Sequence, residues 1–303
     1  METYTPFAIF GGDDWAVKEG GRLVENAEAT RPPVLLFHGL TGAPAELQAI
    51  SRALRRAGYV VETPMLPGHG VDEKTLLKTG WKDWLGAAEA ELIRLSDLAG
   101  GPIFVGGLSM GAVLALALAQ RHPERVKGLA ILAVTLKYDG FNCPSYSWLL
   151  PHGAKTPFIR LYRFKERPPY GVKDVRMRAK IEEMMFSGSS SDAGLPFMPG
   201  KSLAENLKLV ELVERRLEDV FAPALVVHSV EDDVTDIRNA RRLAASLSGP
   251  VTTLFLEDSY HLVTVDQERV KVAQATIQFF DSLCKEDSAV ELELETAHFP
   301  PLS

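Results

Sequence analysis

From Pro33 to Leu283 the chain repeats one pattern, in which a short apolar segment is followed by a longer segment with apolar residues at helical spacing. Apolar runs of about four to eight residues that end at glycine are typical of buried strands. Strands that alternate with helices of this length form a parallel sheet with helices on both faces, so the sequence predicts an α/β fold. The predicted strands span 33–39, 59–66, 102–107, 126–134 and 251–262, and residues 222–234 are predicted as a further strand that leads into an acidic loop. The predicted helices span 45–58, 81–100, 110–121, 240–249 and 270–283.

Residues 137–219 interrupt this alternation. The segment is rich in aromatic residues and methionine, contains a Ser/Gly patch, and mixes apolar with charged residues at helical spacing. We interpret it as an inserted helical lid, which leaves residues 1–136 and 220–285 to form the α/β core. The last residues, 286–303, are acidic and end close to a pair of prolines, so we expect a mobile tail.

Composition argues against several classes of protein. The net charge of −7 disfavours nucleic-acid binding, which relies on patches of Lys and Arg. No apolar run reaches the ~20 residues of a membrane span, and the N-terminal residues do not resemble a secretory signal; a short strand or hairpin is expected there, around 5–10 and 22–25. We therefore expect a cytoplasmic protein without integral membrane association. Cys143 and Cys284 form no CxxC pattern, so we expect reduced thiols and no metal site.

A G-x-S-x-G motif, Gly107 to Gly111, lies between a predicted strand and a predicted helix. In that context the motif forms a tight turn, whose flanking residues must be small and whose serine hydroxyl is held clear of the backbone. Ser109 is also placed at a helix N-terminus, where the helix dipole stabilises developing negative charge. Ser109 is therefore the candidate nucleophile. The alternative is a glycine-rich turn with an incidental serine.

A serine hydroxyl is a weak nucleophile at neutral pH and needs a base. Where this kind of turn carries a catalytic serine, the acid and then the base follow it in the chain. His261 is the only histidine at the junction of the last predicted strand and the last predicted helix, so it is the candidate base. His122 is interpreted as a surface residue, His152 lies in the lid, His228 lies inside a strand pattern as a core or supporting residue, and His298 lies in the tail.

The acid is expected at the end of the preceding strand, in a loop that offers Glu231, Asp232, Asp233 and Asp236. The spacing between Asp232 and His261 leaves room for one helix and one strand. We therefore favour Asp232, with Asp233 as the alternative. The carboxylate would hold the imidazole in the required tautomer and stabilise the imidazolium. The remaining carboxylates are expected to cap the following helix or to face solvent.

The oxyanion formed during acyl transfer needs backbone donors. One is expected from the N–H of Met110, which follows the nucleophile, and the other from the loop after the first predicted strand. The segment HGLTG, residues 38–42, occupies that place, and Leu40 is the expected second donor. His69, in the segment PGHG, precedes the nucleophile in the chain, so we expect it to shape a loop rather than to act as the base.

The segments HGLTG, PGHG, GLSMG, HSVEDDV and DSYHLVTVDQE together resemble the α/β-hydrolase superfamily, and more closely its bacterial carboxylesterases and monoacylglycerol lipases with a small helical lid. The resemblance covers residues 33–283 and is strongest in the core segments. It implies an α/β-hydrolase fold with an inserted lid and no cofactor. It also implies a triad and two oxyanion donors at the positions argued above: Ser109, Asp232, His261, Leu40 and Met110.

The resemblance further implies hydrolysis of carboxylic esters with short to medium acyl chains, or of monoacylglycerols, through an acyl-enzyme on Ser109. The aromatic and Met residues of the lid are expected to line an apolar acyl pocket, although packing within the lid would account for them equally well. Tyr260 stands where many relatives have glycine, and the lid is longer than theirs. Amide, thioester or acyl-peptide hydrolysis by the same triad remains open, as do a cofactor-free haloperoxidase or C–C bond hydrolase and a non-enzymatic binding protein of this fold.

Overall fold

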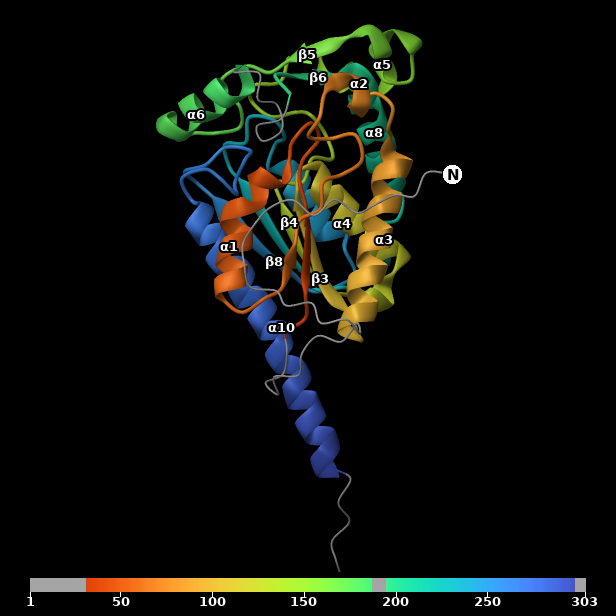
Figure 1. Ribbon diagram of the computed structural model, residues 1–303, viewed down its shortest axis with the longest axis vertical. Helices are drawn as coiled ribbons and strands as arrows, with labels where there is room; N and C mark the ends of the chain where they lie inside the picture. The colour runs from red at the N-terminus through yellow and green to blue at the C-terminus, as the bar shows by residue number, and fades with distance from the viewer. Residues whose placement is uncertain (1–30, 187–194, 298–303) are drawn as a thin grey trace, which may run out of the picture. The chain divides into compact units, whose positions relative to one another are not determined.

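The computed structural model describes residues 31–186 and 195–297. Its centre is a six-stranded sheet with the strand order β2-β1-β3-β4-β7-β8, in which all neighbouring strands run parallel (Figure 1). The strands of this sheet are β1 (Val34–Phe37), β2 (Val61–Glu62), β3 (Ile103–Leu108), β4 (Val126–Leu132), β7 (Ala224–Ser229) and β8 (Val251–Leu256). The predicted parallel α/β architecture is confirmed.

Helices cover both faces of the sheet (Figure 1). One face packs against α3, α4, α8 and α9, and the other packs against α1 and α10. The bounds of these helices are α1 (Gln48–Arg56), α3 (Trp81–Ala99), α4 (Met110–Arg121), α8 (Gly200–Glu214), α9 (Arg238–Ser246) and α10 (Arg269–Ala297).

Strand β1 shows why the strands are apolar throughout. Leu35 and Phe37 belong to the core cluster on one face of the sheet, and Val34 and Leu36 belong to the cluster on the other face. Successive side chains of a strand point to opposite faces, so a strand covered by helices on both sides is apolar at every position. The uninterrupted run VLLF follows from that requirement.

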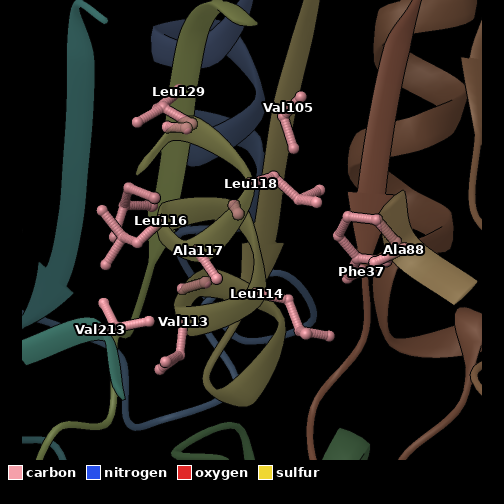
Figure 2. Packing of buried hydrophobic residues seen from close by; sticks show 14 of the residues in the cluster. Phe37, Ala88, Val105, Val113, Leu114, Leu116, Ala117, Leu118, Leu129 and Val213 are labelled. Atoms are coloured by element: carbon pink, nitrogen blue, oxygen red, sulfur yellow. The ribbon is translucent and has the colours of Figure 1, made fainter. Parts of the chain in front are cut away.

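Helix α4 is apolar on all sides because it packs between the sheet and two other helices. Its side chains from residue 110 to residue 119 are all buried. Figure 2 shows some of them in one cluster with Phe37 of β1, Ala88 of α3 and Val213 of α8, and labels Val113, Leu114, Leu116, Ala117 and Leu118. A helix that is hydrophobic all round is typical of a protein interior. The bounds of α4 match the predicted helix, so the residue before it, Ser109, is placed on a rigid support.

The inserted segment divides into two parts. The first part lies over one end of the sheet (Figure 1). It contains α5 (Leu150–Gly153), β5 (Arg163–Lys165), α6 (Val175–Phe186) and β6 (Phe197–Pro199), of which β5 and β6 form an antiparallel pair that the sequence did not predict. The second part is α8, whose Leu209, Val210 and Val213 belong to the core cluster that contains α4. The predicted lid boundary at residue 219 is therefore too late, because α8 is a layer of the core.

The largest differences between predicted and observed element ends are at β2, β8 and α10. β2 is shorter than the predicted strand 59–66, and Pro64, which has no N–H to donate to a ladder, lies just beyond it. β8 ends at Leu256, so the residues up to 262 form the loop that carries His261. α10 extends to Ala297, past the predicted end at residue 283 and into the predicted tail.

Some expectations fall outside the described residues. These are the strand or hairpin around 5–10 and 22–25, the Ser/Gly patch at 187–191, and the final residues 298–303. Within the described ranges, no helix combines the length and the apolar character that a membrane span requires.

Candidate active site

Ser109 occupies a strained turn between β3 and α4. Its backbone dihedrals are φ 57° and ψ −113°, a conformation that side-chain-bearing residues seldom adopt. Its N–H donates to the carbonyl oxygen of Leu132, 2.9 Å away, at the end of β4. A Cβ added at Gly107 would overlap the backbone of Gly111, and one added at Gly111 would overlap the carbonyl of Phe37. The two glycines therefore let α4 approach β1 and β3 closely enough to hold the serine at this turn.

His261 and Asp232 form a buried pair. His261 lies in the loop after β8, and Asp232 lies in the loop after β7. The Nδ1–H of His261 donates to Asp232, with distances of 2.8 Å to Oδ2 and 3.1 Å to Oδ1. Asp232 Oδ1 also accepts the N–H groups of Val234 and Thr235, at 2.8 and 2.9 Å. These bonds fix the carboxylate, and the carboxylate fixes the ring with Nδ1 protonated, which leaves Nε2 as the basic nitrogen.

Opposing effects act on the pKa of His261. Burial disfavours the charged ring, but the charge and the hydrogen bond of Asp232 favour it, as do the nearby carboxylates of Asp233 and Glu46. The net result is a pKa raised above the ordinary value of 6.5. The ring is therefore a better proton acceptor than an isolated histidine.

Asp233, the alternative acid, contacts the backbone instead of the imidazole ring. Its Oδ2 accepts the N–H of Gly171 in the lid at 3.0 Å, and its Oδ1 accepts the N–H of His261 at 3.3 Å. Burial raises the pKa of Asp233, and the bonds from these two N–H groups only partly offset that effect. Asp233 thus joins the lid to the loop that carries His261.

The other residues around Asp232 have structural contacts. Glu231 pairs with Lys173 at 2.6 Å. Asp236 accepts the N–H of Arg238, the first residue of α9, at 2.8 Å. His228 is fully buried in β7, with its Nε2 3.1 Å from the carbonyl of Thr235 and 3.7 Å from Asp232 Oδ2. His228 therefore supports, from within the core, the loop that carries Asp232.

Ser109 and His261 line one cavity of about 610 Å³. The Ser109 hydroxyl is 3.0 Å from the hydroxyl of Thr135, and within the described part of the chain no residue forms a hydrogen bond with Nε2 of His261. The structure therefore brings the predicted nucleophile and base to the same cavity, with the serine hydroxyl bonded to a different partner. Sequence reasoning did not identify Thr135.

The two loops that precede the nucleophile in the chain are joined through His38. Its Nδ1–H donates to the carbonyl of Gly39 at 2.9 Å, and its Nε2 accepts the N–H of Leu66 at 3.2 Å. Burial lowers the pKa of His38 to about 3, so the ring is neutral and holds this tautomer. His69 packs edge-on against the rings of His38 and Trp84, with centroids 5.0 and 5.5 Å apart. This arrangement agrees with a loop-shaping role for His69.

The backbone N–H groups of Leu40 and Met110, the two predicted oxyanion donors, form no hydrogen bond with the residues that the structure describes. Leu40 lines the cavity. Met110 is the first residue of α4, where N–H groups lack an intrahelical acceptor. Glu46 accepts the neighbouring N–H of Gly39 at 3.0 Å and thereby fixes the loop that carries Leu40.

Aromatic and apolar side chains form part of the cavity wall. Several of the aromatic and Met residues expected from the lid line it: Tyr138, Tyr146, Tyr162, Phe164, Met185 and Met198. Trp148 and Phe158 do not line it and are 70% and 76% exposed. Tyr260 also lies outside the lining and packs against Phe141, with the ring centroids 5.2 Å apart.

Two acidic residues of the cavity, Glu46 and Glu166, were not anticipated from the sequence. The pKa of each is raised to about 7, mainly by burial, and the charge of Asp233 contributes to the shift at Glu166. No motif marks either residue: Glu46 lies in the short 3-10 helix Pro44–Leu47 that leads into α1, and Glu166 directly follows β5 of the lid. Within the described ranges, no cluster of His, Cys, Asp or Glu could hold a metal ion.

The fold and this geometry define a hydrolase of the α/β-hydrolase fold. The sequence matches the family described as serine aminopeptidase, S33, over residues 28–268, and the chain belongs to that family. It is 27% identical to a thermostable monoacylglycerol lipase of Bacillus sp. strain H-257 over 248 residues, which cover 82% of this chain and 89% of that protein.

Two further comparisons agree. The chain is 26% identical to a carboxylesterase of Bacillus subtilis strain 168 over 251 residues, which cover 82% of this chain and 92% of the relative. A solved monoacylglycerol lipase of Paleococcus ferrophilus superposes with a TM-score of 0.69 at 19% identity, and the match covers 84% of this chain and 96% of that one. The structural likeness establishes the shared fold.

Proposed function

We propose that this chain hydrolyses carboxylic esters through an acyl-enzyme on Ser109, with His261 as general base and Asp232 as the residue that orients it. One observation carries the proposal: His261 is held by Asp232 at 2.8 Å, at a cavity that Ser109 also lines. An activated serine requires a base that is itself oriented by a third group, and these residues meet that requirement.

The proposed reaction has two halves. Ser109 Oγ attacks the ester carbonyl carbon while Nε2 of His261 takes the hydroxyl proton, and the N–H groups of Leu40 and Met110 stabilise the oxyanion. The tetrahedral intermediate collapses, the alcohol leaves with the proton from His261, and the acyl group stays on Ser109. Water then attacks the acyl-enzyme with the same base, which releases the carboxylic acid and restores the serine.

The substrate class follows from the cavity and from the relatives. A cavity of about 610 Å³ has the size of a small-molecule site, and its apolar walls suit an alkyl chain. The relatives named monoacylglycerol lipase and carboxylesterase support short to medium acyl esters or monoacylglycerols as substrates. No cofactor takes part in this scheme.

The test is a kinetic series of p-nitrophenyl esters and monoacylglycerols from acetate to palmitate, with wild type and Ser109→Ala. We expect hydrolysis with an optimum at short or medium chains, and a loss in kcat on the order of 10⁴-fold or more in Ser109→Ala. Turnover that is unchanged in Ser109→Ala would contradict the proposal. Absence of turnover and of serine labelling in the wild type would instead favour a binding protein of this fold.

Amide hydrolysis is the second candidate, because the matching family is described as serine aminopeptidase. Acidic side chains in the cavity, Glu46 and Glu166, would also suit a substrate with an amino group. Matched ester, thioester and amide substrates that share one acyl group separate these reactions, and we expect the ester to have the highest kcat/KM. A cytoplasmic location stays a prediction, to be checked by cell fractionation.

A further inference from the structure

We propose that Thr135 is a positioning residue for the nucleophile, whose hydroxyl holds the Ser109 hydroxyl away from His261 in the free enzyme. The proposal rests on the proposed function, because it concerns the same serine and the same base. It adds a step to the reaction: the serine hydroxyl must leave Thr135 and turn to the imidazole before it can attack.

The first observation is the hydrogen-bond partner of the serine hydroxyl. Ser109 Oγ and Thr135 Oγ1 are 3.0 Å apart, a normal distance for a hydrogen bond between hydroxyl groups. Thr135 is fully buried and is not among the residues that line the cavity, whereas Ser109 and His261 both line it. The bond therefore draws the serine hydroxyl toward the protein interior and away from the space that a substrate would occupy.

The second observation is the state of the base. His261 uses Nδ1 for Asp232, and no residue in the described ranges forms a hydrogen bond with its Nε2. Nε2 is the nitrogen that takes the serine proton in the proposed reaction, and in this state it has no hydrogen bond to Ser109. The two observations agree, since one concerns the serine hydroxyl and the other the imidazole edge that it leaves without a partner.

The direction of the serine proton follows from the surroundings of Thr135. The Thr135 hydroxyl lies 3.4 Å from the carbonyl oxygen of Ala133, which can only accept a hydrogen bond. Either hydroxyl can donate across the Ser109–Thr135 contact, and when Thr135 directs its own proton to Ala133 it accepts the proton of Ser109. In that arrangement the Ser109 proton points away from Nε2 of His261.

The backbone keeps the two hydroxyls together. Leu108 and Leu132 pair where β3 and β4 end, and the N–H of Ser109 donates to the carbonyl of Leu132. Ala133 then adopts a left-handed conformation with φ 45°, and its N–H donates to Val227 of β7 at 2.8 Å. Such a conformation is unfavourable for alanine and persists only where the surroundings impose it. The strain at Ala133 belongs to the turn that carries Thr135 to the nucleophile.

This bond competes with the bond that catalysis needs. Only those molecules whose serine faces His261 can react. The apparent rate is therefore the intrinsic rate multiplied by the fraction of molecules in that state. Removing the threonine hydroxyl without changing the shape of the side chain should therefore accelerate attack by Ser109. Simple structural damage at this position would slow it.

The experiment measures the rate of labelling by a fluorophosphonate probe in wild type, Thr135→Val, Thr135→Ser and Ser109→Ala. Valine keeps the shape of threonine and lacks its hydroxyl, whereas serine keeps the hydroxyl. We expect Thr135→Val to be labelled faster by about 3- to 10-fold, the factor that one neutral hydrogen bond is worth, with the change in the inactivation rate constant rather than in reversible probe binding. Thr135→Ser should match the wild type.

Each other outcome has a defined meaning. Labelling of folded Thr135→Val at or below the wild-type rate overturns the proposal, and so does equal acceleration in Thr135→Ser. Thermal unfolding checks that the variants are folded, and Thr135→Ala replaces the valine variant if that one does not fold. Labelling that persists in Ser109→Ala would contradict the proposed function itself, so the two failures are distinguishable.

Discussion

Two adjacent carboxylates, Asp232 and Asp233, lie beside the same histidine and make different contacts. Asp232 bonds the imidazole ring, and Asp233 bonds the backbone N–H groups of His261 and Gly171. A group that holds the ring sets its tautomer, whereas a group that holds the backbone sets the position of the loop. The two residues should therefore respond differently to the same substitution.

The first prediction compares Asp232→Asn with Asp233→Asn. An asparagine at position 232 can hold the ring in the wrong tautomer, so kcat should fall on the order of 10³- to 10⁴-fold. At position 233 the change replaces one backbone acceptor, and the loss should stay below about tenfold, the scale of one neutral hydrogen bond. Steady-state kinetics on one short ester measure both, and equal losses would contradict the assignment of Asp232.

The second prediction concerns pH. The base must be neutral to take a proton, and the pKa of His261 is raised above 6.5 because the acidic residues around it outweigh the effect of burial. Activity should therefore fall with decreasing pH, with a midpoint in kcat/KM above 6.5. Asp233→Asn removes one of those charges and should move the midpoint down, whereas Glu62→Gln on the exposed edge strand should not. A wild-type midpoint at or below 6.5 would refute this account.

At the scale of single residues, the sequence was informative where a side chain belongs to a motif with a fixed place in the chain. Ser109, Asp232 and His261 follow strands at positions that the βα pattern makes visible, and the structure brings them to one region. Thr135 and Glu166 reach the site through tertiary packing of segments without a motif. Local pattern carries no information about such contacts.

At the scale of elements, the contact between α4 and β1 sets the position of the nucleophile. Gly111 has no room for a Cβ, because the carbonyl of Phe37 occupies that space, whereas a Cβ at Gly86 in α3 would meet no atom within 4 Å. Both glycines lie in helices, so they form a matched pair.

The third prediction follows from that pair. Gly111→Ala must push α4 away from β1. We expect the unfolding free energy to fall by at least about 1–3 kcal/mol, and the activity to be lost. Gly86→Ala should stabilise α3 by about 0.5–1 kcal/mol, because alanine favours the helix over the unfolded chain. Urea titration of both variants gives the comparison, and a neutral effect of Gly111→Ala would contradict the close approach.

Element boundaries show what the sequence could not supply. The apolar strands and α4 were predictable because periodicity and flanking glycines mark them. The β5–β6 pair was not, since its strands are far apart in the chain and have no shared turn. The division of the inserted segment at α8 was also missed, because an amphipathic helix has the same pattern in a lid and in a core layer.

For the molecule as a whole, buried acids link stability to pH. Burial, with the charge of Asp233, raises the pKa of Glu166 to about 7 from an ordinary value of 4.5. The folded state therefore holds this proton more tightly than the unfolded state does. The resulting stabilisation is complete below about 4.5 and is lost as the pH rises through about 7.

The fourth prediction is that Glu166→Gln gains stability mainly at high pH. Glutamine cannot ionise, so the variant should exceed the wild type in unfolding free energy by roughly 1 kcal/mol more at pH 8 than at pH 5.5, after allowance for partial exposure. Denaturant unfolding at the two pH values measures this difference. Glu62→Gln serves as the exposed control, and a gain of equal size at both pH values would be inconsistent with the raised pKa.

The central claim is that Ser109 forms a covalent acyl-enzyme, and the most direct measurement is the mass of the trapped protein. Wild type and Ser109→Ala are treated with a fluorophosphonate, or quenched in acid during turnover of a slow ester, and analysed by intact mass and peptide mapping. We predict one adduct, on the peptide that contains Ser109, and none in Ser109→Ala. An adduct on any other residue, or one that persists in Ser109→Ala, would contradict the account.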